Sequence, residues 1–131
     1  MLIDYQQIKY EPIDTVVGLD LGIKDFCVDS NNIHYENKHF YKNSEKRLKF
    51  LQKRLSRKQK GSKNRNNARI KLAKLYEKIT NRRNSYLHQI SSRIVNENQV
   101  ICIEDLNVKG MMYSHHLANS IQDLGLYEFR R

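Results

Sequence analysis

Two acidic residues stand inside apolar segments of this chain. Asp20 lies in the run 15–22 and Glu104 in the run 100–106, and both runs have the β-branched, apolar composition of β-strands. An acid within an apolar strand is costly to bury unless something binds it. Hard divalent cations such as Mg²⁺ prefer a few rigidly placed carboxylates. The pair therefore predicts a shared cation, on the condition that the two strands are neighbours in the sheet.

Basic residues are concentrated in the middle of the chain. Residues 38–83 hold 18 Lys and Arg against 2 Asp and Glu, a net charge of +16, whereas the rest of the chain carries −6. A basic block on an acidic body is typical of a surface that binds a polyanion, and phosphate contacts of this kind do not read sequence. The candidate nucleic-acid-binding residues are Lys53, Arg54, Arg57, Lys58, Lys60, Lys63, Arg65, Arg69, Lys71 and Lys74.

Carboxylates and a basic surface together suggest phosphodiester chemistry. Hydrolysis requires charge neutralisation at the attacking and leaving oxygens, which paired Mg²⁺ ions about 3.5–4 Å apart provide. Carboxylates at matching heights on two neighbouring strands would meet this requirement. Asp25, Asp105 and Asp123 are further acids, but a hydrophilic strand end or a helix surface explains them adequately.

The first forty residues predict a β-meander after a polar lead-in. We expect strands over 15–22, 26–30 and 33–40 from β-branched content and alternation. Asn31 and Asn32 favour a tight hairpin turn, because asparagine tolerates positive φ. Three consecutive strands joined in this way would be antiparallel.

The middle of the chain has helical periodicity. Leucines recur from Leu48 to Leu55, the segment 61–64 breaks the helix, a second apolar stripe runs over 68–79, and a third helix is expected over 86–94. The apolar run 100–103 then fits a strand that is covered on both faces and paired in parallel. A loop over 106–113 and a helix over 114–131 are expected to complete the chain.

Composition bounds the class of protein. A chain of 131 residues is expected to form one domain, and it has neither an apolar stretch of membrane-spanning length nor a signal peptide, so a cytoplasmic location is expected. Cys27 and Cys102 are 75 positions apart and form no metal-binding pair. Both are expected to be small buried hydrophobes.

Four motifs, in order, resemble those of a known family. The motif of residues 18–25, GLDLGIKD, resembles the first motif of RuvC-like nuclease domains. Residues 54–65, RLSRKQKGSKNR, resemble the basic helical segment of TnpB (OrfB) insertion-sequence proteins. Residues 100–111, VICIEDLNVKGM, look like that family's second motif, and residues 118–129 are similar to its following helix.

The resemblance implies a fold and a domain organisation. The expected fold class is α/β, a partial RNase H-like (RuvC-like) mixed sheet with a basic helical insertion. Residues 1–14 would form a lead-in, residues 15–131 a partial nuclease domain, and the insertion would cover about 41–98. In that fold the strands carrying Asp20 and Glu104 lie side by side and parallel.

The resemblance also implies an activity. The family consists of transposases that act as RNA-guided DNA endonucleases, so DNA and a guide RNA are the implied partners, and the basic segment lies against the guide–target heteroduplex. Asp20 and Glu104 correspond to the family's catalytic, Mg²⁺-binding acids. The family's third acid and its zinc ribbon have no counterpart in this sequence, so impaired hydrolysis is expected. The alternatives are a non-catalytic DNA- or RNA-binding module and a decayed transposon remnant.

Overall fold

The computed structural model describes residues 14–113 and 117–131, arranged as a mixed α/β structure. The expected lead-in lies outside this part of the chain except for Asp14, and so do residues 114–116 of the expected last helix. Within the described residues, no helix is long and apolar enough to cross a membrane.

A four-stranded sheet has the order β3-β2-β1-β4. Its strands are β1 (Val16–Leu21), β2 (Asp25–Asp29), β3 (His34–Glu36) and β4 (Val100–Ile103). β1, β2 and β3 form the predicted antiparallel meander, and β4 pairs in parallel with β1 as predicted. A parallel pair requires a long crossover, which the intervening helices supply.

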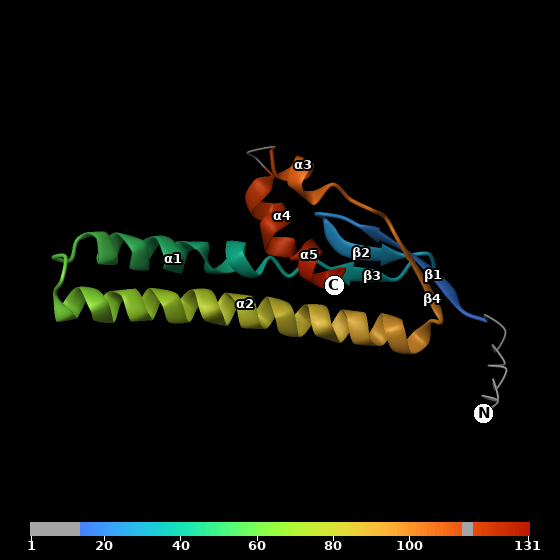
Figure 1. The fold of residues 1–131 in the computed structure, drawn as a ribbon, viewed down its shortest axis with the longest axis horizontal. Coiled ribbons are helices and arrows are strands. Elements are labelled where there is room, and N and C mark those ends of the chain that lie inside the picture. Colours follow the sequence, from blue (N-terminus) through green and yellow to red (C-terminus); the bar gives the residue numbers. More distant parts are fainter. Residues whose placement is uncertain (1–13, 114–116) are drawn as a thin grey trace, which may run out of the picture.

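Two long helices form an antiparallel hairpin that projects beyond the sheet (Figure 1). α1 (Phe40–Ser56) and α2 (Lys63–Glu97) are joined by a short turn in which Gly61 has a φ of 82°. The Ser62 hydroxyl caps α2 by accepting the backbone N–H of Arg65 at 3.1 Å. The Arg65 guanidinium in turn donates to the carbonyl of Leu55 in the last turn of α1 and to that of Lys58 just after the helix, each at 3.0 Å.

The core lies between one face of the sheet and the helices. Alternation in β1 places Val17, Leu19 and Leu21 on the buried face. They pack in one cluster with α2 residues such as Ile90 and Ile94, and with α4 (Ala118–Leu124) and α5 (Leu126–Phe129). Burial of each such side chain is worth about 1.5–3 kcal/mol. The opposite face of the sheet is therefore the face on which polar groups can act.

The structure corrects the predicted ends of two elements. The expected third strand over 33–40 ends at Glu36, because the Asn37 side chain bonds the carbonyl of Ile23 at 2.7 Å and the amide of His39 at 3.1 Å. His39 has a φ of 46°, and α1 begins at the next residue. The two helices expected over 68–79 and 86–94 are the single helix α2, because no Gly or Pro separates them.

The C-terminal region also differs from the prediction. The expected loop over 106–113 contains a short helix, α3 (Val108–Met112), capped by the Asn107 side chain, which accepts the amide of Gly110 at 2.9 Å. The helix expected over 114–131 is divided into α4 and α5 at Gly125, whose φ of 69° is left-handed.

The expected burial of β4 and of both cysteines is only partly correct. The side chains of Ile101 and Ile103 are 37% and 36% exposed, so β4 is not covered on both faces within the described chain. Cys27 is buried as predicted, whereas Cys102 is exposed. The difference arises because β4 is an edge strand in the described sheet and β2 is an inner strand.

Candidate metal and nucleic-acid sites

Asp20 and Glu104 are brought together by the parallel pairing of β1 with β4. Leu19 and Ile103 are direct partners in the ladder, and each acid is the next residue along its strand. Neighbouring strands lie about 4.8 Å apart. The two carboxylates therefore leave the sheet at the same height from adjacent strands, which is the relationship on which the predicted shared cation depends.

Both acids line a shallow depression on the sheet face that points away from the helices. Its volume is about 430 Å³, and its other lining residues are Gly18, Leu19, Val28, Asp29, Ser30, Cys102 and Ile103. Asp20 and Glu104 are exposed to solvent, so neither acid carries the cost of burial considered from the sequence. A cation is still expected here, because two carboxylates on adjacent strands repel each other and a counter-charge between them relieves this repulsion.

Neither carboxylate is used for structural contacts within the described residues, since no hydrogen bond or ion pair involves the side chain of Asp20 or Glu104. Other acids in the neighbourhood have such contacts. Asp25 pairs with His34 Nδ1 at 2.9 Å, and Asp105 with Arg130 Nη2 at 2.7 Å. Asp20 and Glu104 are thus the pair left open to solvent and to a ligand.

The donor set of this pair fits a hard divalent cation. Mg²⁺ commonly takes one or two carboxylates and completes its shell with water and substrate phosphate oxygens. Among residues 14–113 and 117–131, no group of three or more His, Cys, Asp or Glu side chains gathers at one place. The described chain thus offers two carboxylate ligands for a cation and leaves other positions open.

Asp123 has a structural contact and is not on the helix surface. It is 8% exposed, and its two carboxylate oxygens accept the backbone N–H of Tyr41 at 2.9 Å each. Tyr41 lies in the first turn of α1, where amides lack partners within the helix. Asp123 therefore caps α1 from α4, although the two residues are 82 positions apart in the sequence. It is not among the residues that line the depression with Asp20.

The basic residues of the hairpin gather along a groove between α1 and α2. This groove has a volume of about 900 Å³ and is lined by seven cationic side chains and no acid. Its apolar lining includes Phe50, Leu51 and Leu75. The cations are Lys38, Arg47, Arg54, Lys71, Lys74, Lys78 and Arg82.

Only part of the predicted basic set lines this groove. Arg54, Lys71 and Lys74 do, whereas Arg65 is bound to the carbonyls at the end of α1, and Arg69 donates to Asn66. The remaining predicted residues, Lys53, Arg57, Lys58, Lys60 and Lys63, lie towards the turn of the hairpin and outside the groove lining.

Four groove cations, Lys38, Arg47, Lys78 and Arg82, were missed because the sequence argument covered only residues 53–74. Lys78 and Arg82 continue the spacing of three and four residues that Lys71 and Lys74 begin, so all four share one face of α2. Arg47 precedes Arg54 by seven residues on α1. Following these spacings further in both directions would have found them, whereas Lys38 precedes α1 and has no such signal.

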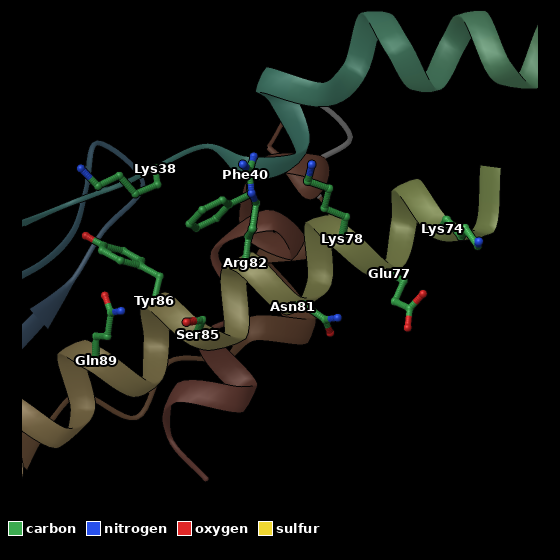
Figure 2. Close-up of a pocket in the computed structure, with 10 residues that line it drawn as sticks. All are labelled: Lys38, Phe40, Lys74, Glu77, Lys78, Asn81, Arg82, Ser85, Tyr86 and Gln89. Atoms are coloured by element: carbon green, nitrogen blue, oxygen red, sulfur yellow. The ribbon is translucent and has the colours of Figure 1, made fainter. Parts of the chain in front are cut away.

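A second cavity of about 670 Å³ continues the groove towards the sheet (Figure 2). The two share Lys38, Phe40, Lys74, Lys78 and Arg82. Tyr86 lies at this end, with its ring centroid 5.8 Å from that of Phe40 and with the Lys38 ammonium 5.9 Å from it. Burial raises the pKa of the Tyr86 hydroxyl, which donates to the carbonyl of Glu36 at 2.5 Å.

Two curated proteins are similar to this chain. One from Streptomyces pristinaespiralis, named "Putative RNA-guided DNA endonuclease", is 40% identical over 114 residues, which cover 87% of this chain and 28% of that protein. One from Escherichia coli K12, named "Putative RNA-guided DNA endonuclease InsQ", is 33% identical over 135 residues, covering 92% of this chain and 34% of that protein. The chain spans about a third or less of these curated relatives.

The family comparison covers most of the sequence. The family OrfB_IS605, described as "Probable transposase", matches residues 3–115. This range includes both candidate acids and the whole helical hairpin. The chain therefore belongs to the OrfB_IS605 transposase family.

Proposed function

We propose that this chain supplies part of an RNA-guided DNA endonuclease, with an RNase H-like sheet that holds Asp20 and Glu104 as ligands of Mg²⁺. The observation that carries the proposal is the parallel register of β1 and β4, which places both acids at one height on the open face of the sheet. The names of the two curated relatives support the same activity.

The proposed chemistry is hydrolysis of a DNA phosphodiester. Mg²⁺, when bound, would neutralise charge on the attacking and leaving oxygens. The role of this chain's residues is to hold the cation at the sheet face. The depression above Gly18 and Cys102 is shallow and open, so a phosphate of an extended strand could reach the carboxylates without entering a closed cavity.

The helical hairpin is proposed to bind nucleic acid, whether DNA or a guide RNA. Its groove presents seven cations and no acid, so it would attract phosphates and release counterions on binding. Such binding would weaken steeply with salt.

Hydrolysis by this chain alone is proposed to be slow. Two-metal sites usually need more carboxylate ligands than the two that the described residues bring together. Purified chain should therefore bind DNA in Mg²⁺ without rapid cleavage. Robust cleavage that Asp20→Ala abolishes would contradict this part of the proposal.

A non-catalytic nucleic-acid-binding module is the second candidate. The observation that favours it is the separation of the two sites, since the basic groove and the acidic depression share no lining residue. This candidate predicts binding that is unchanged by removal of Mg²⁺ or by Asp20→Ala.

A chimera tests the endonuclease proposal most directly. The matching segment of the Escherichia coli relative would be replaced by this chain, and guided DNA cleavage would be compared with that of the unaltered relative. We expect cleavage to be lost in Asp20→Ala and Glu104→Ala and kept in Asp105→Ala, the matched control. Cleavage that survives Asp20→Ala would contradict the assignment.

A further inference from the structure

We propose that the outer part of the helical hairpin opens and closes locally in the free protein and that a bound polyanion holds it closed. This outer arm consists of residues 49–78, which include the turn between α1 and α2 and project away from the sheet (Figure 1). The inference rests on the proposed nucleic-acid-binding function of the hairpin. It adds that binding changes the local stability of the surface that binds.

The outer arm lacks a buried core of its own. Leu48, which is 1% exposed, and Ile79, which is 5% exposed, lie just inside its boundary on α1 and α2. In residues 49–78, all of which the structure describes, no residue is buried. The half-buried apolar residues between the two helices are Leu51, Leu55, Ala68, Leu72 and Leu75. Segments with few buried apolar contacts open at the lowest free energy in a folded protein.

The inner part of the hairpin, by contrast, is attached to other elements. Both carboxylate oxygens of Asp123 accept the Tyr41 amide, and Arg83 Nη1 donates to the carbonyl of Gln122 at 3.3 Å. The buried residues of α2 that follow Arg83 belong to the core cluster. The outer arm can therefore open while the inner part of the hairpin stays folded.

Charge repulsion acts against closure of the outer arm. It holds 12 Lys and Arg against 1 acid, Glu77, a net charge of +11. Among the ion pairs of the described residues, only that of Lys49 with Glu45, at 2.7 Å, involves the arm, and Glu45 lies outside it. Like charges one turn apart destabilise a helix, and like charges on facing helices oppose their approach. Weak packing and repulsion together favour opening of the free arm.

The groove allows one ligand to relieve repulsion on both helices. Arg54 of α1 lines it together with Lys71 and Lys74 of α2. Phosphates in the groove would supply the counter-charge that the arm lacks. A ligand that binds the closed arm and not the open one raises the closed population according to its concentration relative to its dissociation constant. Binding and closure are therefore coupled.

Arg65 differs from the other cations of the arm in its effect on closure. Its guanidinium donates to two carbonyls at the end of α1, so its contacts favour closure although its charge opposes it. Gln52 Nε2 also joins the two helices by donating to Tyr76 Oη at 2.8 Å. Within the described residues, no hydrogen bond or ion pair involves the side chain of Lys53. Lys53 therefore contributes repulsion without a compensating contact.

Hydrogen exchange of the full chain, followed by mass spectrometry of its peptides, tests the proposal without a ligand. At low salt, peptides of the outer arm should exchange faster than those of residues 79–97. Raising NaCl from about 0.01 M to about 1 M shortens the screening length from about 30 Å to about 3 Å. We expect this change to slow exchange in the arm by about fivefold or more, because many like-charge pairs are screened at once. Exchange in residues 79–97 should change less.

Two substitutions with the same change of charge separate repulsion from the Arg65 contact. Lys53→Gln removes a cation that only repels, so it should slow exchange in the outer arm at low salt. Arg65→Gln removes a cation together with its bonds to the carbonyls, so it should speed exchange there. Effects of the same sign, or no effect of either variant, would overturn the proposed balance between repulsion and contact.

A second series of exchange measurements adds a ligand at low salt. The probes are a short RNA–DNA hybrid and inorganic polyphosphate, each at a saturating concentration that a binding titration has verified. We expect both to slow exchange in the outer arm by about tenfold or more. Because closure depends on neutralisation of charge, polyphosphate that binds without slowing exchange would overturn the proposal even if the hybrid slowed it.

The outcomes distinguish this inference from the proposed function. Binding of the hybrid with unchanged exchange in the outer arm would overturn the inference and leave nucleic-acid binding by the hairpin supported. The inference would also be overturned if the free arm exchanged as slowly as residues 79–97 at low salt, or if NaCl did not slow its exchange. Failure of the hybrid to bind would contradict the proposed function and the coupling together.

Discussion

Leu19 of β1 and Ile103 of β4 are direct partners in a parallel pair of strands. Because each is followed by an acid, the ladder sets Asp20 and Glu104 side by side on the open face of the sheet. The connection between these strands contains β2, β3 and the α1–α2 hairpin, so the candidate nucleic-acid surface lies within the connection that brings the two acids together.

The cap that Asp123 provides to α1 should be measurable as stability. Asp123→Ala leaves the Tyr41 amide without its partner, and loss of a helix cap costs about 0.5–2 kcal/mol of unfolding free energy. We expect a lower midpoint of thermal unfolding. Glu128→Ala, an exposed acid of α5, is the control and should unfold like the wild type. An unchanged midpoint in Asp123→Ala would contradict the capping role.

Gly125 is required by both conformation and space. Its φ is +69°, and an added Cβ would lie 3.0 Å from Leu87 Cδ1 and 3.1 Å from Arg83 Cδ. Gly61 has a φ of +82° with nothing within 4 Å of the same position. Backbone strain alone costs about 1–2 kcal/mol. Denaturant unfolding should therefore show a larger loss for Gly125→Ala than for Gly61→Ala, and equal losses would rule out crowding.

The two cysteines should differ in reactivity. Burial above all, with the carboxylates of Asp29 and Asp20 nearby, raises the pKa of the Cys27 thiol to about 11, whereas Cys102 is exposed. The folded protein should titrate one thiol with Ellman's reagent at pH 8, and the chain in denaturant should titrate both. Rapid reaction of two thiols in the folded protein would contradict the described core.

The raised pKa of Cys27 also predicts a pH dependence of stability. The folded state holds this proton more tightly than the unfolded chain, whose thiol has a pKa of about 8.5. The resulting stability is fully present below that pH and is lost as the pH rises through about 11. Cys27→Ala should reduce this alkaline loss in denaturant titrations, whereas Cys102→Ala should not.

Charge reversal in the groove should weaken nucleic-acid binding and its salt dependence. Lys78→Glu and Arg82→Glu remove cations that face phosphates in the proposed complex. Each should lower affinity at low salt and reduce the slope of log affinity against log salt by about 1 or more. Lys109→Glu on α3 makes the same charge change outside the groove. An equal effect of Lys109→Glu would show that only net charge matters.

The sequence predicted the strands that position the acids better than it predicted their surroundings. Alternation in β1 and the positive φ favoured by Asn32 are local signals, and both predictions are confirmed. The exposure of Ile101 was not predictable in this way, because it depends on which strands flank β4. Likewise, Asn37 ends β3 through a bond to Ile23, a contact that no local pattern reports.

The cations of the groove were also predicted only in part, because local charge density does not reveal tertiary contacts. Charge density identified the hairpin, but spacing within the run could not tell Arg54, which lines the groove, from Arg65, which binds the carbonyls at the end of α1. The cap that Asp123 gives to Tyr41 joins residues 82 positions apart and left no signal in the sequence. Tertiary contacts decide which charged side chains line the groove and which bond to the backbone.

The central claim is that Asp20 and Glu104 together hold a divalent cation, and Mn²⁺ titration followed by the electron paramagnetic resonance of the free ion tests it most directly. We predict saturable binding to the wild-type chain, weakened about tenfold or more by Asp20→Ala and by Glu104→Ala. The double variant should be no weaker than either single one, because both remove one site. Asp105→Ala should bind like the wild type, since Asp105 pairs with Arg130. Binding that is indifferent to Asp20→Ala, or equally reduced by Asp105→Ala, would contradict the account.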